Sequence, residues 1–596
     1  MGHRWRHSGV HLLVLQPLTG RVMLKKRFLT FQPAEHLDLA SALRDLQPGR
    51  VVVLAAVPEW VMFLGQAGES ALASLGFRWP QHVASGEAWA GVAILGHGVV
   101  AEAATAVQPR QYPANTLHLL TTLPKGTQEG KACEWYLEAE LRLQGRFCRR
   151  FEGYGDLCSC VAPFSPAVRY KQEQLVMKEQ IPVVVVTASN PRHLYRVLRN
   201  LFSIPGAAQT EVLVAVDGAH QEALALTEVL GVGVVVHRPE GVGNNRTNAN
   251  VRFALYSVFR SFPQADKAIV VEDDLLLSPD FLSFFHQAAW LLDNDPTIFC
   301  VNAFNSNSLP GIASDTTKML RSESYPMYGW MVARSYARQV ITNWIPEGPG
   351  DWDWWLMRAW AQRGRDVVSP EVSRTFHAGN AGAHVDGFEQ HLYYSRMLTS
   401  QVPHIVLQNL SSIILENYLE EMKREIEAAE MVIPDPSEES FLPEGRPGPF
   451  VVFVRSGTRT DEFFGIRLFL MRLGSYFWDT REIFRGVMRL KYQGRLLYVV
   501  GCPLSQLFCR YNPKGTFFLA PSKDLITAVS EANNLYEQSL YDVVSRVRQP
   551  TQDLQQEADL LNYVTRPRGA SSRRSTFTER STLGTRSTSI LPRHEA

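Results

Sequence analysis

Residues 267–274, Lys-Ala-Ile-Val-Val-Glu-Asp-Asp, decide the fold, because an apolar run ends there in three adjacent acidic residues. The run predicts a buried strand, and a helix is expected to follow with Ser278 as its N-cap and Pro279 as its first residue. Carboxylates at the carboxyl edge of an α/β sheet can hold a divalent metal on a phosphate. The alternative is an acidic loop that only caps the next helix.

Three similar units precede this stretch. Short apolar strands alternate with amphipathic helices, which predicts an α/β domain with a doubly wound, mostly parallel sheet covered by helices on both faces. Asp217 closes the second strand, so it is expected at the same sheet edge as the acids that end the fourth. We expect Asp217 with Glu272 or Asp273 to hold uridine and ribose, and Asp274 to hold the metal. The strands are expected at 181–186, 211–216 and 232–236, and the helices at 193–202, 222–230 and 250–262.

The chain of 596 residues is long enough for several domains. Residues 8–122 are predicted to form a small α/β binding module, because a hairpin signal and two further apolar strands lie there. The expected divisions after it are a cysteine-bearing linker (123–180), the catalytic domain (181–400), its C-terminal part (401–522), and a helical extension with a disordered basic tail (523–596).

Charge and hydropathy exclude two function classes. A net charge of +1 argues against a dedicated nucleic-acid binder, whose surface is strongly basic. No stretch approaches the roughly 20 apolar residues that a membrane helix needs. The apolar run at residues 10–15 is also shorter than the core of a signal peptide. We therefore expect no membrane anchor in this sequence.

Four of the seven cysteines, Cys133, Cys148, Cys158 and Cys160, fall close together. A zinc site is one interpretation, but the Cys-x-Cys spacing is tighter than structural zinc usually has, and no histidine accompanies it. Two disulfides that pin the linker are favoured, and they imply an oxidising compartment.

A second cluster of candidate functional residues is Asp351-Trp352-Asp353-Trp354-Trp355. Tryptophan is a typical surface for stacking on sugars. A carboxylate among aromatic rings is partly desolvated, which raises its pKa and suits it to act as a general base. The alternative is a packed aromatic turn with acids on the surface.

Several segments, in this order and spacing, resemble the inverting β-1,2-N-acetylglucosaminyltransferases, and above all the branch that extends O-linked mannose. The N-terminal module is similar to the carbohydrate-binding stem domain of that branch. The segments that carry the resemblance are 272–275, 300–305, 329–330, 352–355 and 370–375, with 146–160 and 498–501 closest to the O-mannose branch.

The resemblance implies a GT-A-type enzyme of the Golgi lumen that transfers from UDP-N-acetylglucosamine to an O-mannosylated glycoprotein, with manganese as cofactor and a glycan bound at the stem domain. By matching position, Asp274 resembles the manganese ligand and Asp353 the catalytic base. Residues 379–387, with Gly382, align with the loop that closes over the donor. The positions that match donor contacts are Arg192, Asp217, Asn250, Glu272, Asp273 and Trp352.

The sequence departs from the family at several positions. Asn250 replaces a histidine that contacts uracil, and Phe304 and Ser306 replace a tryptophan and an aspartate. Cys300 matches one half of a family disulfide whose partner position holds Val367. The metal ligand and the base are retained, which favours an active enzyme. Two alternatives stay open: the same chemistry on another mannosyl acceptor, and a catalytically silent paralogue that binds a glycan or a partner.

Overall fold

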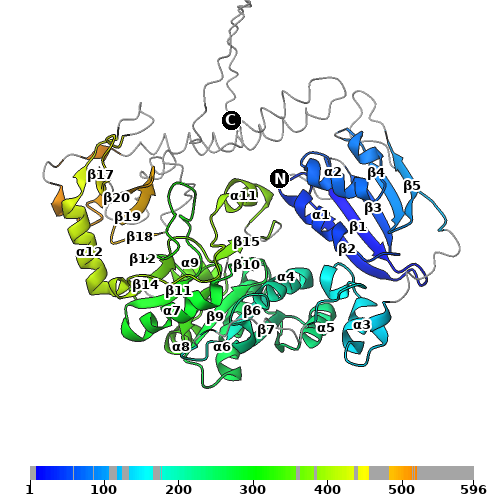
Figure 1. Cartoon of the computed structure of the whole chain (residues 1–596), viewed down its shortest axis with the longest axis horizontal. Coiled ribbons are helices and arrows are strands. Elements are labelled where there is room, and N and C mark those ends of the chain that lie inside the picture. Colours follow the sequence, from blue (N-terminus) through cyan, green and yellow to red (C-terminus); the bar gives the residue numbers. More distant parts are fainter. Residues whose placement is uncertain are drawn as a thin grey trace, which may run out of the picture.

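A computed structural model gives the architecture (Figure 1). No helix in the part of the chain that it covers is long and apolar enough to cross a membrane. The predicted basic tail and Gly382 lie outside the described residues. The structure describes residues 8–57, 59–84, 86–105, 117–123, 133–165, 175, 177–348, 350–357, 363–380, 385–434, 441–455, 482–512, 515 and 517–519.

The N-terminal domain is an antiparallel sheet packed with two helices, which confirms the predicted α/β module. Its five strands lie in the order β2-β1-β3-β4-β5. The rings of Trp60 and Trp89 stack in its core with their centroids 5.6 Å apart. The elements are β1 (Gly9–Leu15), β2 (Val22–Phe28), α1 (Glu35–Arg44), β3 (Val51–Val57), α2 (Gly65–Ser74), β4 (Trp89–Ile94) and β5 (Gly98–Ala104).

The linker, which contains α3 (Arg142–Cys148), is held by two disulfides, Cys133–Cys160 and Cys148–Cys158. This confirms the disulfide prediction over the zinc alternative. The linker is also tied to the N-terminal domain, because Glu152 accepts hydrogen bonds from Arg50 Nε at 2.6 Å and from the backbone N–H of Gln47 at 2.7 Å. A third disulfide, Cys502–Cys509, was not predicted.

The central domain has an eight-stranded sheet in the order β12-β14-β11-β13-β9-β6-β7-β8. Four of its seven strand pairs are parallel, as predicted, while β13 and β12 run antiparallel to their neighbours. The strands are β6 (Val183–Thr187), β7 (Val212–Asp217), β8 (Gly233–His237), β9 (Lys267–Glu272), β11 (Ile298–Asn302), β12 (Met319–Ser322), β13 (Trp330–Ala333) and β14 (Asp366–Pro370).

Strands β6, β7 and β9 are buried on both faces of this sheet, and for that reason they are continuous apolar runs, whereas the edge strand β8 is partly exposed. Val183 and Val185 pack with α4, α5 and α7 on one face, and Val184 and Val186 pack with α6 and α8 on the other. The helices are α4 (Pro191–Leu201), α5 (Gln221–Leu230), α6 (Asn244–Ser261), α7 (Phe281–Asn294) and α8 (Arg334–Thr342).

Helices α4 and α5 start two residues and one residue before the predicted positions, and the starts of α7 and α6 differ for identifiable reasons. Helix α7 begins at Phe281 with Asp280 as N-cap, so the N-cap prediction at Ser278 is wrong. The reason is that residues before it form β10 (Leu275–Leu277), which pairs with β15 (Thr375–His377), and Ser278 N–H continues this pairing by donating to Arg374 O at 2.9 Å. Helix α6 starts at Asn244, before the predicted 250, because its first turns are rich in asparagine and carry no apolar periodicity.

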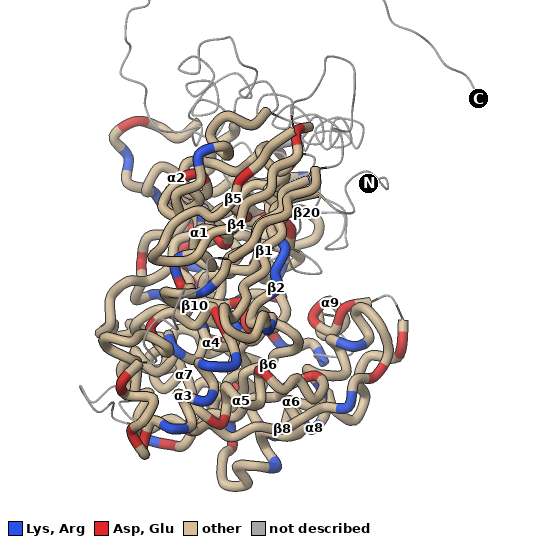
Figure 2. Tube along the Cα trace, turned by 90° about the vertical axis from the view of Figure 1, so that its right-hand side faces the viewer, with Lys and Arg blue, Asp and Glu red and all other residues tan. Residues whose placement is uncertain are grey.

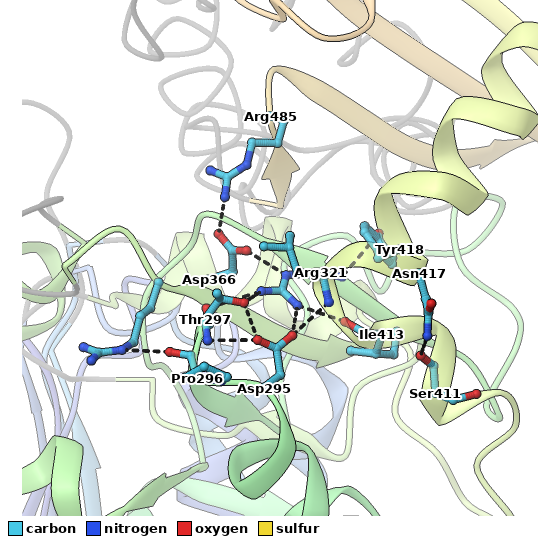
Figure 3. A network of polar contacts seen from close by, with 12 residues as sticks. Asp295, Pro296, Thr297, Arg321, Asp366, Ser411, Ile413, Asn417, Tyr418 and Arg485 are labelled. Atoms are coloured by element: carbon cyan, nitrogen blue, oxygen red, sulfur yellow. Dashed lines mark hydrogen bonds and ion pairs between the residues drawn. The ribbon is translucent and has the colours of Figure 1, made fainter.

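The C-terminal region forms a separate six-stranded sheet. Helix α12 (Leu415–Ala428) connects this sheet to the central domain. Its Tyr418 hydroxyl accepts a hydrogen bond from Arg321 N–H at 3.3 Å, and the Tyr418 ring meets Phe484 edge-on with ring centroids 5.0 Å apart. At this junction, the buried Arg321 side chain lies in a network of polar contacts (Figure 3). The strands are β16 (Glu430–Met431), β17 (Phe450–Arg455), β18 (Ile483–Phe484), β19 (Val487–Tyr492), β20 (Arg495–Cys502) and β21 (Phe518–Leu519).

Candidate active site

The acidic triplet lies where the parallel strands β9 and β6 end, next to each other in the sheet. Thr187, the last residue of β6, donates its hydroxyl to Asp273 Oδ2 at 2.5 Å. Burial and the neighbouring Asp274 carboxylate raise the pKa of Asp273 to about 7. Burial, with the negative charges of Asp274, Asp353 and Asp273, raises the pKa of Glu272 well above its usual range. The triplet and Asp353, from separate parts of the chain, are therefore within electrostatic reach of one another.

The Asp274 carboxylate has one oxygen engaged and one available. Its Oδ2 lies 3.2 Å from His377 Nε2, whereas its Oδ1 is buried and has no hydrogen-bond partner within the described part of the chain. The backbone comes close on one side, because a Cβ on Gly379 would lie 3.1 Å from Asp274 Oδ2. An unpaired buried carboxylate oxygen fits a hard divalent cation, which prefers oxygen ligands. The described residues contain no group of three or more His, Cys, Asp or Glu side chains that could together hold a metal ion. Further ligands would have to come from the donor or from water.

His377, at the end of β15, was missed by the sequence analysis. Its Nδ1 lies 3.1 Å from Gln390 Oε1, and Gln390 Nε2 donates to the backbone carbonyl of His377 at 2.8 Å. The second bond fixes which end of the amide faces the ring, so Nδ1 donates and Nε2 is left to face the Asp274 carboxylate. Burial alone would lower the pKa of His377, but the Asp274 charge and these hydrogen bonds raise it.

Asp353 sits at the start of the short helix α9 (Trp352–Leu356). The start of this helix is tied to α6, since Asn248 Oδ1 accepts from Trp352 N–H at 3.0 Å and Asn248 Nδ2 donates to Gly350 O at 2.9 Å. The Trp352 ring is buried between Trp330 and Trp344, with centroids at 5.8 and 6.5 Å. Both faces of this indole are covered, so its predicted contact with the donor would involve the backbone or the ring edge. The more exposed ring is that of Trp354.

Two predicted uridine contacts lie on α6 and β7. Asn250 is buried and donates to Thr187 O at 3.1 Å, while its Oδ1 has no hydrogen-bond partner among the described residues. That oxygen can accept a hydrogen bond. Asp217 is also buried, but both of its carboxylate oxygens are engaged: Oδ1 with His237 Nδ1 at 2.8 Å, and Oδ2 with Arg246. A nucleotide would have to share or displace these partners.

Arg196, rather than Arg192, is the arginine that acts electrostatically on the triplet. Arg192 donates to Glu152 O and forms an ion pair with Glu222 at 3.0 Å, and it lines a cavity of about 930 Å³ between α4 and the N-terminal domain. Arg196, one helical turn further along α4, donates to Ala378 O at 3.0 Å and acts electrostatically on Asp274. Charged residues of both signs gather where α4, β6 and β10 meet (Figure 2).

Phe304, the residue expected to replace a tryptophan, is packed in the protein core. Phe304 is buried against Tyr328 and Tyr394, with ring centroids 4.7 and 6.4 Å away. Ser306 is buried beside it, and its carbonyl accepts a hydrogen bond from Tyr393 at 2.9 Å. Cys300 is a buried free thiol directly opposite Val367 in the parallel β11–β14 pair, where the family bridge would be.

Comparison with known sequences agrees with this arrangement. Residues 156–438 match the model of the GNT-I family. Residues 8–97 match the family described as interleukin-like EMT inducer. The chain is also 28% identical over 231 residues to an alpha-1,3-mannosyl-glycoprotein 2-beta-N-acetylglucosaminyltransferase from Arabidopsis thaliana. That match covers 36% of this chain and 51% of the relative, so the chain spans about half the length of the curated relative it matches. The first matched segment covers the central domain with part of the linker, and the second covers most of the N-terminal domain.

Among solved structures, similar chains include glucosyl-3-phosphoglycerate synthase from Mycobacterium tuberculosis, solved with Mn²⁺, UDP and glucosyl-3-phosphoglycerate (12% identity, 27% of this chain and 58% of that one, TM-score 0.18). Apo UDP-glucose pyrophosphorylase is another (8% identity, 33% and 93%, TM-score 0.22). Mouse xyloside xylosyltransferase 1 is a third (12% identity, 22% and 54%, TM-score 0.17).

Proposed function

We propose that this chain is an inverting β-1,2-N-acetylglucosaminyltransferase that uses UDP-N-acetylglucosamine and a mannose O-linked to a glycoprotein, in the Golgi lumen. The observation that carries the proposal is the unpaired, buried Oδ1 of Asp274 at the edge of the sheet, with Asp353 within electrostatic reach of the same group of acids. Both lie inside the segment that matches the GNT-I family. Three disulfides support an oxidising compartment.

The chemistry assigned to the chain's own residues is acid–base and positional. Asp353 accepts the proton of the mannose 2-hydroxyl. At the same time the hydroxyl oxygen forms a bond to the anomeric carbon of the donor sugar, and the bond between that carbon and the UDP oxygen breaks. Asn250 Oδ1 accepts a hydrogen bond from the uracil N–H. Asp274 would hold a divalent ion, Mn²⁺, which when bound offsets the charge on the departing diphosphate.

The test is UDP release from UDP-N-acetylglucosamine with Mn²⁺ across a small panel of acceptors: an O-mannosyl peptide, an α-1,3-mannosyl N-glycan and free mannose. Asp353→Asn should lose turnover by roughly 100-fold or more, because the positioned base is gone. Glu416→Gln, at an exposed position in the first turn of α12, is the control and should stay close to wild type. Turnover on the N-glycan alone would move the acceptor away from O-mannose.

A second candidate is a catalytically silent protein that binds a glycan at its N-terminal domain. One observation favours it: both oxygens of Asp217, where uridine would be held, are taken by His237 and Arg246. Glycan binding without UDP release on any acceptor would support this candidate.

A further inference from the structure

The N-terminal domain contacts the central domain at a point close to the acidic triplet. Helix α11 (Gly387–Leu392) lies between the two domains (Figure 1). Gly387 N–H, at its first residue, donates to Gln32 Oε1 at 3.2 Å, and Phe388 packs edge-on against Phe63 with ring centroids 5.7 Å apart. Asp386 caps the helix by accepting hydrogen bonds from two of its backbone N–H groups. The start of α11 is therefore held both by its own N-cap and by the N-terminal domain.

This contact requires a glycine. A Cβ on Gly387 would lie 2.3 Å from Pro33 O and 2.9 Å from Gln32 Cβ, which is far inside any van der Waals contact. The φ angle of Gly387 is not positive, so an alanine there would be unfavourable because of the clash rather than its backbone conformation. The backbone of the N-terminal domain therefore touches the backbone of α11 directly.

One helical turn later, α11 reaches the Asp274 side. Gln390 is buried and bonds both to the ring and to the backbone carbonyl of His377. The His377 ring then meets Asp274 Oδ2 at 3.2 Å, and the backbone N–H of Ala378 donates to Asp274 O at 2.8 Å. Five contacts thus join Gln32 in the N-terminal domain to Asp274 by way of α11 and His377.

We propose that the N-terminal domain is an intramolecular brace for the candidate metal-binding carboxylate, acting through α11, with Gln390 and His377 as positioning residues. The metal-related part of this inference rests on the proposed function. Partners that hold the side chains around a metal ligand fix its orientation, and losing one typically costs about 10–100-fold in metal affinity. The brace limits Asp274 Oδ1 to one direction, which suits a cation bound to a single protein carboxylate.

The first experiment tests the brace without any ligand, by hydrogen exchange on the full chain. Gln390→Met should speed exchange of the Ala378 amide while residues 387–391 stay protected by their contact with the N-terminal domain. Gly387→Ala should speed exchange in both places. Gly348→Ala is the matched control, because a Cβ there has open space and φ is not positive. Wild-type exchange at Ala378 in both variants would overturn the proposal.

The second experiment measures Mn²⁺-dependent UDP binding by calorimetry in the same variants. Affinity should fall about tenfold or more in Gln390→Met and Gly387→Ala and stay within about twofold in the control. Gln390→Glu, which keeps an acceptor for His377 Nδ1, should recover part of the loss. If the wild-type chain binds no UDP with Mn²⁺, the proposed function fails, whereas the exchange experiment still decides whether the brace exists. Unchanged affinity in both variants of a binding-competent chain would overturn the link to Asp274.

Discussion

Replacement of Arg321 by methionine should destabilise the junction between the central domain and the C-terminal sheet. The Arg321 side chain is fully buried and forms ion pairs with Asp295 at 2.7 Å and Asp366 at 2.6 Å. It also donates to Ile413 O at 2.9 Å, just before α12 (Figure 3). Methionine fills similar space but leaves both carboxylates without this cation.

The expected loss of stability depends on the partners that Asp295 and Asp366 keep once Arg321 is replaced. Asp295 retains hydrogen bonds from the backbone N–H groups of Thr297 and Leu415, both at 2.9 Å. Among the described residues, Asp366 retains only the longer ion pair with Arg485 at 3.6 Å, and burial already raises its pKa. Removing one partner of a buried ion pair costs about 3–5 kcal/mol. For a domain of this size that loss lowers the unfolding temperature by about 6–20 °C.

The assay is thermal unfolding followed by intrinsic fluorescence at neutral pH, with Arg338→Met on the exposed face of α8 as the control. The control should shift the midpoint little, since surface substitutions usually stay within about 0.5 kcal/mol. A further variant, Arg321→Met with Asp366→Asn, should recover part of the loss because one uncompensated charge is removed. If Arg321→Met unfolds within about 2 °C of wild type, the network does not hold this junction.

Two further predictions concern buried groups elsewhere. Burial lowers the pKa of His286 to about 4, so the unfolded chain takes up a proton near pH 6.5 before the folded chain does. The free energy of unfolding should therefore fall as pH drops from about 6.5 to about 4, and it should fall less steeply in His286→Gln. Urea titration at several pH values measures this, and equal slopes in the two proteins would contradict the assignment. Val367→Cys should close a bridge with Cys300, its neighbour across β11 and β14, so that the single free thiol of the wild type disappears in a thiol assay under denaturing conditions. A variant with two reactive thiols would mean that the two residues are not neighbours.

The predictable parts of the fold are those in which burial determines the pattern of apolar residues in the sequence. Strands β6, β7 and β9 are covered on both faces, so each is a continuous apolar run that ends in a polar residue at the sheet edge. The two linker disulfides followed from cysteine spacing. Strand β8 is an edge strand with exposed Val234 and Val236, and its sequence does not distinguish it from a central strand.

The contacts that position the site were not predictable, because they join residues far apart in the sequence. His377 and Asp274 meet only because β15 pairs with β10. Arg192 and Arg196 lie one turn apart on the same helix, and only the packing of α4 decides that Arg192 faces the linker. Gly387 has no local reason to be glycine, since the atom it avoids is Pro33 O in another domain.

The most direct measurement is UDP binding with and without Mn²⁺ for the wild type, Asp274→Asn and Asp353→Asn. The wild type should bind UDP more tightly with the metal. Asp274→Asn should lose that gain, and Asp353→Asn should keep it while losing transfer to the mannosyl peptide. A wild-type chain that binds no UDP with any divalent ion, or an Asp274→Asn variant whose binding still depends fully on Mn²⁺, would contradict the account.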